Sequence, residues 1–134
     1  MLTERAQRRL ETAGRAGLAS LFVLGGINKI MNYPGTLERM TDVGLSPAGL
    51  LLPLTIALEL GGGLALIVGV PALRVIAGLT LATFTLATNV FFHRFWELDG
   101  MIGDLELSLF FKNLAIAGAL VMAAGVRRGQ VSTA

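Results

Sequence analysis

Six polar or ionisable side chains lie within or beside long apolar segments, and they are the candidates for chemistry: Lys29, Glu59, Asn89, His93, Lys112 and Asn113. A carboxylate at the centre of a bilayer costs about 2.5 to 3.5 kcal/mol or more unless it is paired or protonated. Lys112 is the best-placed partner for Glu59, so we expect an ion pair between them. Such a pair is either a structural contact that fixes helix register or a ligand or proton site, and the structural interpretation is favoured.

His93 stands where an apolar segment ends, next to Trp96, and this position favours an anchor at the membrane interface. Its unperturbed pKa is close to neutrality, so it could also pass protons to a ligand bound beside Asn89. One histidine with scattered carboxylates is a weak metal signal, and we expect no metal site. No pattern in the sequence assigns a catalytic residue.

The residue counts exclude several other classes of protein. The absence of cysteine excludes disulfides, Cys-ligated zinc, iron–sulfur clusters and thiol chemistry by this chain, and a single histidine excludes bis-histidine haem ligation within it. The formal net charge of +2 is small and scattered, so we expect no nucleic-acid binding.

The composition is that of a membrane protein. Of the 134 residues, 54% are hydrophobic and only 15% are charged, and the mean hydropathy is +0.70. A soluble domain carries about a quarter charged residues. We therefore expect a single domain, residues 1–134, embedded in a lipid bilayer.

Four apolar stretches are long enough to cross the bilayer, which takes about 20 residues each: residues 14–31, 47–70, 72–92 and 105–126. Pro71 marks a turn between the second and third stretches, and polar connections are expected at 33–45 and 93–104. The first twelve residues alternate arginines with apolar residues, which predicts a short amphipathic helix on the membrane surface. The predicted fold is all-α: a membrane-embedded antiparallel four-helix bundle with a short N-terminal amphipathic segment.

Small residues mark the faces on which the helices should meet, because large apolar side chains face lipid as readily as protein. We expect Gly25, Gly26, Gly62 and Gly63 to serve close helix packing. The alternative is that the glycine run 61–63 breaks its helix beside Glu59 and exposes backbone groups to a ligand. The same small-residue stripes could also serve contacts between copies of the chain, so a homo-oligomer remains open.

The basic residues predict the orientation of the chain. Four crossings put both termini on one side of the membrane. Seven arginines belong to that side against two in the opposite loops: Arg5, Arg8, Arg9, Arg15, Arg74, Arg127 and Arg128 against Arg39 and Arg94. The positive-inside rule then places both termini in the cytoplasm. Lys29 and the lack of a small-residue cleavage pattern argue against a cleaved signal peptide.

The sequence resembles the DoxX family of small bacterial four-helix membrane proteins over nearly its whole length. Four motifs carry the resemblance: FFKNLAIAG at 110–118, HRFW at 93–96 after Phe92, Glu59 followed by Gly62 and Gly63, and Gly25 and Gly26 followed by Lys29. The resemblance implies a multi-pass protein of the bacterial cytoplasmic membrane.

Family members, and the related DoxD type, are linked to quinone-dependent oxidoreductase complexes. The resemblance therefore implies an accessory membrane subunit with a membrane or soluble oxidoreductase partner. We expect the chain to carry no intrinsic cofactor. A quinone is the candidate ligand, and the side chains that could offer it hydrogen bonds are Lys29, His93, Lys112 and Asn113. The alternatives are a non-catalytic membrane scaffold and a small-solute carrier, and whether the chain is an enzyme stays open.

Overall fold

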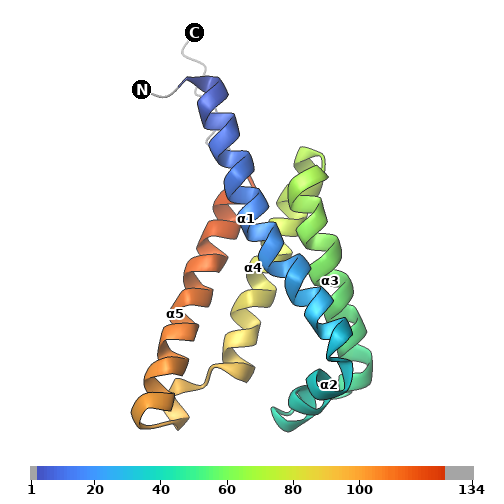
Figure 1. The fold of residues 1–134 in the computed structure, drawn as a ribbon, viewed down its shortest axis with the longest axis vertical. Coiled ribbons are helices and arrows are strands. Elements are labelled where there is room, and N and C mark those ends of the chain that lie inside the picture. The colour runs from blue at the N-terminus through green and yellow to red at the C-terminus, as the bar shows by residue number, and fades with distance from the viewer. Residues whose placement is uncertain (1–2, 126–134) are drawn as a thin grey trace.

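The computed structural model describes residues 3–125, and this part of the chain is entirely helical. Its elements are α1 (Glu4–Met31), α2 (Tyr33–Asp42), α3 (Ala48–Val68), α4 (Pro71–Phe92), the short 3-10 helix η1 (Phe95–Glu97) and α5 (Gly100–Ala123) (Figure 1). The predicted all-α class is confirmed. The end of the predicted fourth stretch, residue 126, and the arginines at 127 and 128 lie outside the described residues.

The long helices contact one another in sequence order. α1 packs along α3, α3 packs on α4, and α4 packs on α5, while α1 also contacts α5. α2 lies against α3 at the end of the molecule opposite to the start of α1 and the end of α5 (Figure 1). The antiparallel four-helix bundle in a bilayer stays a prediction.

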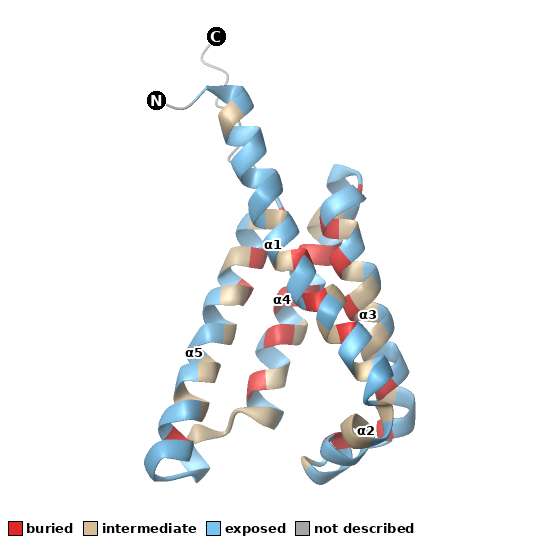
Figure 2. Ribbon diagram, viewed as in Figure 1, coloured by how far each residue is buried: buried red, intermediate tan, exposed pale blue. Residues whose placement is uncertain are grey.

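Three helical stretches of the described residues are long and apolar enough to cross a membrane: Ala48–Val68, Pro71–Glu97 and Gly100–Ala123. α1 is not among them, because Arg15, Asn28 and Lys29 interrupt its apolar part. Many large apolar side chains face outward along the helices, including Leu54, Ile76 and Val121. An outward apolar surface suits lipid and not water. Figure 2 shows that the outer faces of the helices are largely exposed.

The predicted amphipathic segment at the N-terminus is not a separate helix. Thr3 caps the helix by accepting a hydrogen bond from the backbone N–H of Ala6 (3.3 Å), and α1 then runs without a break to Met31. Gly14 and Gly17 stand where a break was expected, yet both keep helical geometry. A glycine costs a helix only about 1 kcal/mol, which continuous hydrogen bonding on both sides outweighs.

Two predicted connections contain helix. Within the predicted connection 33–45, residues 33–42 form α2, which has Pro34 in its first turn, a position where the missing N–H of proline costs nothing. Tyr33, Leu37 and Met40 lie on one face and pack on Ala48 and Leu52. The second connection, 93–104, holds η1 and the first turn of α5, so the predicted start at 105 is several residues late.

The main core lies halfway along the helices. It contains Ala19 and Phe22 of α1 and Leu66 of α3. Buried residues of α4, including Leu81, and of α5, including Leu120, complete it. Leu66, Leu81 and Leu120 are each 0% exposed, and Figure 2 shows buried residues gathered where the helices cross. Two cavities lie on either side of this core along the helices, as their lining residues show.

Candidate functional site

An ion pair between α1 and α3 is the central feature of the site. Lys29 Nζ donates a hydrogen bond to Glu59 Oε1 over 2.9 Å. The Glu59 side chain is 7% exposed and the Lys29 side chain is 25% exposed. Lys29 lies in the last turn of α1, so its charge also interacts favourably with the negative end of the helix dipole.

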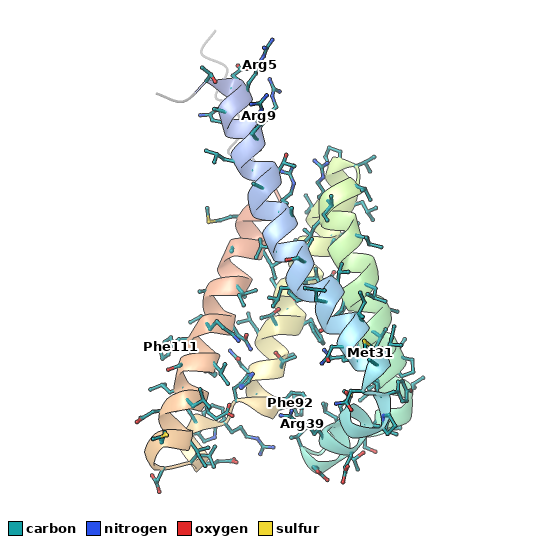
Figure 3. The ribbon with its side chains drawn as sticks, in the orientation of Figure 1. Arg5, Arg9, Met31, Arg39, Phe92 and Phe111 are labelled. Carbon is teal, nitrogen blue, oxygen red and sulfur yellow. The ribbon has the colours of Figure 1, made fainter. Side chains whose placement is uncertain are left out.

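The predicted partnership between Glu59 and Lys112 is wrong. Lys112 is exposed on the outer face of α5, and the structure gives it no acidic partner among residues 3–125. The neighbouring Phe111 is likewise exposed and projects away from the other helices (Figure 3). Residues that follow one another in a helix point about 100° apart. Because Asn113 faces α4, Lys112 must turn away from it.

A chain of polar contacts joins α4 to α5. Asn113 Nδ2 donates to Asn89 Oδ1 (2.9 Å), and Asn89 Nδ2 donates to the carbonyl oxygen of Phe110 (3.1 Å). Asn89 is 2% exposed. Both polar ends of its amide are therefore satisfied inside an apolar environment, where an unpaired amide is costly.

His93 contacts a carboxylate to which the sequence analysis assigns no role. His93 Nδ1 and Glu106 Oε2 lie 2.7 Å apart, and both side chains are about one fifth exposed. The two residues flank the connection between α4 and α5, so the sequence contained a signal. α4 and α5 pack on each other, so polar residues near this connection on the two helices come close together. The contact occupies Nδ1 and leaves Nε2 as the second ring nitrogen for another partner.

These contacts surround a cavity of about 560 Å³, here called the polar cavity. Its lining comes from all five α-helices and from the residue that ends α4, and it includes Lys29, Glu59, Thr85, His93 and Asn113. Phe92 of α4 and Arg39 of α2 also line it, and Figure 3 places them near each other in the space between these helices. The volume is in the range of sites for small organic molecules, about 300 to 1,000 Å³.

One atom of the polar cavity has unused hydrogen-bonding capacity. Glu59 Oε2 is buried and has no hydrogen-bond partner among the described residues, although Oε1 of the same carboxylate is bonded to Lys29. A buried acceptor without a donor is unfavourable, and native structures usually supply a protein group, a water or a ligand at such a place. The geometry thus leaves room for an O–H or N–H donor at Glu59.

Of the six predicted polar residues, the structure places four on the cavity wall: Lys29, Glu59, His93 and Asn113. Asn89 lies behind them as the partner of Asn113. Lys112 lies apart, on the outer face of α5.

The glycines near the ion pair lie at close helix contacts. A Cβ atom on Gly25 would come within 3.5 Å of Glu59 Oε1, and one on Gly26 within 2.8 Å of Leu60. On α3, a Cβ on Gly63 would lie 2.9 Å from Val23, and one on Gly62 3.0 Å from Leu81. α3 stays helical through residues 61–63, so the alternative of a helix broken beside Glu59 is wrong.

Comparison with known protein families gives one match. The sequence model of the DoxX family matches residues 10–94, more than half of the chain. The motif at 110–118 lies outside that match.

Two relatives come from Escherichia coli (strain K12). Inner membrane protein YqjF is 36% identical over 121 residues, which cover 87% of this chain and 86% of the relative. Inner membrane protein YphA is 27% identical over 118 residues, which cover 88% of this chain and 83% of the relative. No solved structure matches the chain.

Proposed function

The chain belongs to the DoxX family, and on this premise we propose that it is an accessory subunit of a quinone-linked oxidoreductase complex in the bacterial cytoplasmic membrane. The quinone head group is held in the polar cavity. The observation that carries the proposal is the buried, unpartnered Oε2 of Glu59 on the wall of a cavity that also carries the N–H donors of Lys29, Arg39 and Asn113. Both relatives are named as inner membrane proteins, which supports the location.

The polar side chains of the cavity suit a ligand that accepts hydrogen bonds at some atoms and donates hydrogen bonds at others. Lys29 and Asn113 offer N–H donors to the carbonyl oxygens of an oxidised ring. Glu59 Oε2 accepts an O–H bond from the reduced ring. When bound, a quinone supplies two-electron, two-proton redox chemistry. The residues of the cavity hold and orient the ring.

His93 stands on the cavity wall contributed by α4 and contacts Glu106 on α5. A carboxylate at Nδ1 orients the imidazole, while Nε2 remains as donor or acceptor. His93 and the Lys29–Glu59 pair therefore offer two places, on different helices, where a proton can be held beside the ligand.

Apolar residues of the polar cavity suit the rest of such a molecule. Phe84, Phe91 and Phe92 line it together with Leu21 and Leu51. A ring stacks on aromatic faces, and an isoprenoid tail is an apolar chain that follows the outer surface into lipid. A protein partner supplies the other redox centre, because this chain has no cysteine and a single histidine.

The test is quinone retention by the purified protein. The chain is extracted in mild detergent, and the bound quinone is quantified and then displaced by a photoreactive quinone analogue. We expect Lys29→Met and Asn113→Leu to lower labelling by about tenfold or more, since each removes a hydrogen bond worth about 1.4 kcal/mol. Lys112→Met is the matched control, because it removes the same charge outside the cavity. Absence of quinone from the wild type, or equal losses in Lys29→Met and Lys112→Met, rejects the site.

A non-catalytic scaffold is the second candidate, and the position of Lys112 favours it. A charged side chain on the outer face of an apolar helix is costly in lipid unless a partner covers it or the chain reaches the interface. A partner's carboxylate at Lys112 would remove that cost. A photoreactive amino acid at Phe111, which is 57% exposed, distinguishes the cases: a crosslink to another protein supports a scaffold, a crosslink to a second copy supports a homo-oligomer, and labelled lipid alone argues against both.

A further inference from the structure

The second cavity of the molecule lies on the other side of the core and takes no part in the proposed function. It measures about 1010 Å³, is partly open, and is lined from α1, from the first turns of α4 and from the last residues of α5. Its wall is apolar along Leu18, Val75 and Met122 and carries Arg15 and Arg74. We call it the arginine cavity.

The two arginines keep donors without partners. The Nε atoms of Arg15 and Arg74 are buried and form no hydrogen bond with the described residues. Each guanidinium group donates one other hydrogen bond, to an uncharged acceptor. Arg15 Nη2 donates to Thr12 Oγ1 over 3.1 Å, and Arg74 Nη2 donates to the carbonyl oxygen of Ile67 over 3.5 Å. A guanidinium presents five N–H donors in a fixed fork that matches phosphate and carboxylate oxygens. Two guanidinium groups with buried free donors therefore call for an anion.

The described part of the chain does not supply that anion. Glu11 is the carboxylate that lines this cavity, and it forms no ion pair with Arg15 or Arg74. The start of α4 adds to the positive potential. Val70 caps the helix without a side-chain hydrogen bond, so the N–H of Ala72, which also lines the cavity, has no helical partner.

We propose that the arginine cavity binds the head group of an anionic phospholipid, with the phosphate between Arg15 and Arg74 and the glycerol and upper acyl chains along the apolar wall. Its volume is at the upper end of what drug-sized ligands occupy, about 1,000 Å³, and most of the wall is apolar. A site for a free phosphate ion would be smaller and polar throughout. Basic pockets between membrane helices on the cytoplasmic side recognise lipid head groups by this chemistry, and the positive-inside rule predicts that this end of the molecule is cytoplasmic.

Binding is measured on the full-length protein in detergent by native mass spectrometry and by thermal unfolding. The ligands are phosphatidylglycerol, phosphatidylcholine and inorganic phosphate. We expect phosphatidylglycerol to bind and stabilise the wild type, and phosphatidylcholine to do so at least about tenfold more weakly. The double variant Arg15→Gln with Arg74→Gln should lose at least about tenfold in phosphatidylglycerol affinity, the ratio for one charge-assisted hydrogen bond.

The control removes two charges elsewhere at the same end of the molecule. Arg5 and Arg9 are exposed on the first turns of α1 (Figure 3), and neither lines the cavity. Arg5→Gln with Arg9→Gln should keep phosphatidylglycerol binding within about twofold. Equal losses in both double variants, or stabilisation of the wild type by inorganic phosphate as effective as that by the lipid, would overturn the proposal.

A second variant guards against misfolding of the arginine mutants. Ala123→Leu adds three carbon atoms to the wall of the cavity and leaves both guanidinium groups in place. It should weaken phosphatidylglycerol binding while the helical circular dichroism spectrum stays that of the wild type. Unchanged lipid affinity in this variant would contradict occupation of the cavity by the lipid backbone.

Discussion

Replacing the two members of the Lys29–Glu59 pair, singly and together, tests the centre of the site. In Lys29→Met the carboxylate of Glu59, 7% exposed, loses its partner and cannot reach water easily. Removing one partner of a buried pair costs about 3 to 5 kcal/mol. In Glu59→Gln the remaining lysine is 25% exposed and can turn towards the interface, and glutamine still accepts a hydrogen bond. We expect a smaller loss there, about 1 to 2 kcal/mol.

The double variant gives the decisive result. With both charges removed, no unpaired ion remains, and we expect it to lose about 1 to 3 kcal/mol, less than Lys29→Met alone. Adding Glu59→Gln to Lys29→Met should therefore restore stability, with a coupling of at least about 1 kcal/mol in the double-mutant cycle.

Unfolding by SDS in mixed micelles measures these free energies. The fluorescence of Trp96, the single tryptophan, reports on unfolding, because its ring packs edge-on against Phe95 and Phe110 in the folded protein. Lys112→Met is the matched control and should change stability by less than about 1 kcal/mol, since this side chain is exposed. Additive losses in the cycle, or a loss in Lys112→Met as large as in Lys29→Met, would refute the pairing.

Four further substitutions test the helix contacts, each by the same unfolding assay. Gly63→Ala should lower the free energy of unfolding by about 1 to 3 kcal/mol, because the new Cβ would lie 2.9 Å from the nearest side-chain carbon of α1. Gly61→Ala is its control: a Cβ there would have nothing within 4 Å, so stability should be unchanged or higher by up to about 1 kcal/mol. Asn89→Leu should lower the free energy of unfolding by about 1 to 2 kcal/mol by removing two hydrogen bonds between α4 and α5, and an unchanged stability would contradict a stabilising role for these bonds. Glu106→Gln should cost less than about 1 kcal/mol, since its contact with His93 is partly exposed; a larger loss would mean that the pair is shielded by lipid.

The apolar pattern was sufficient to predict where most of the long helices lie. The third predicted stretch, 72–92, differs from α4 by one residue at its start. The second, 47–70, contains α3. A run of about 20 apolar residues bounded by proline or glycine has few alternatives to a helix, because lipid offers no partner for an unbonded backbone group.

The pairing of Glu59 needed information that periodicity does not contain. Spacing shows which residues share a face of one helix, but it does not show which neighbour that face meets. Gly25 and Lys29 lie four residues apart on α1, and the missing side chain of Gly25 lets α1 approach Glu59 closely. The next turn then brings Lys29 onto the carboxylate. Close approach at a glycine would therefore have been a better guide to the partner, and it favours Lys29 over Lys112.

α2 was missed because residues 33–45, which include Pro34 and Gly35, were interpreted as a polar connection. Proline at the first turn of a helix is as typical as proline in a turn, and the pattern of apolar residues decides between them. Tyr33, Leu37 and Met40 repeat at steps of four and three, which is a helical face. This short helix supplies Arg39 and Met40 to the wall of the polar cavity, so the error also concealed part of the site.

The position of the core bears on the choice between a binding protein and a solute carrier. Along α4 the residues of the arginine cavity end at Val75, the core holds 77–82, and the polar cavity begins at Phe84. The same order is found on α1, where Leu18 lines the first cavity and Leu21 the second. Leu66, Leu81 and Leu120, all fully buried, occupy the layer between them. A polar solute passing from one cavity to the other would have to displace these close-packed side chains, at a cost of several kcal/mol. Two separate sites, each with its own charges and each reached from its own side, therefore fit this arrangement better than one continuous path.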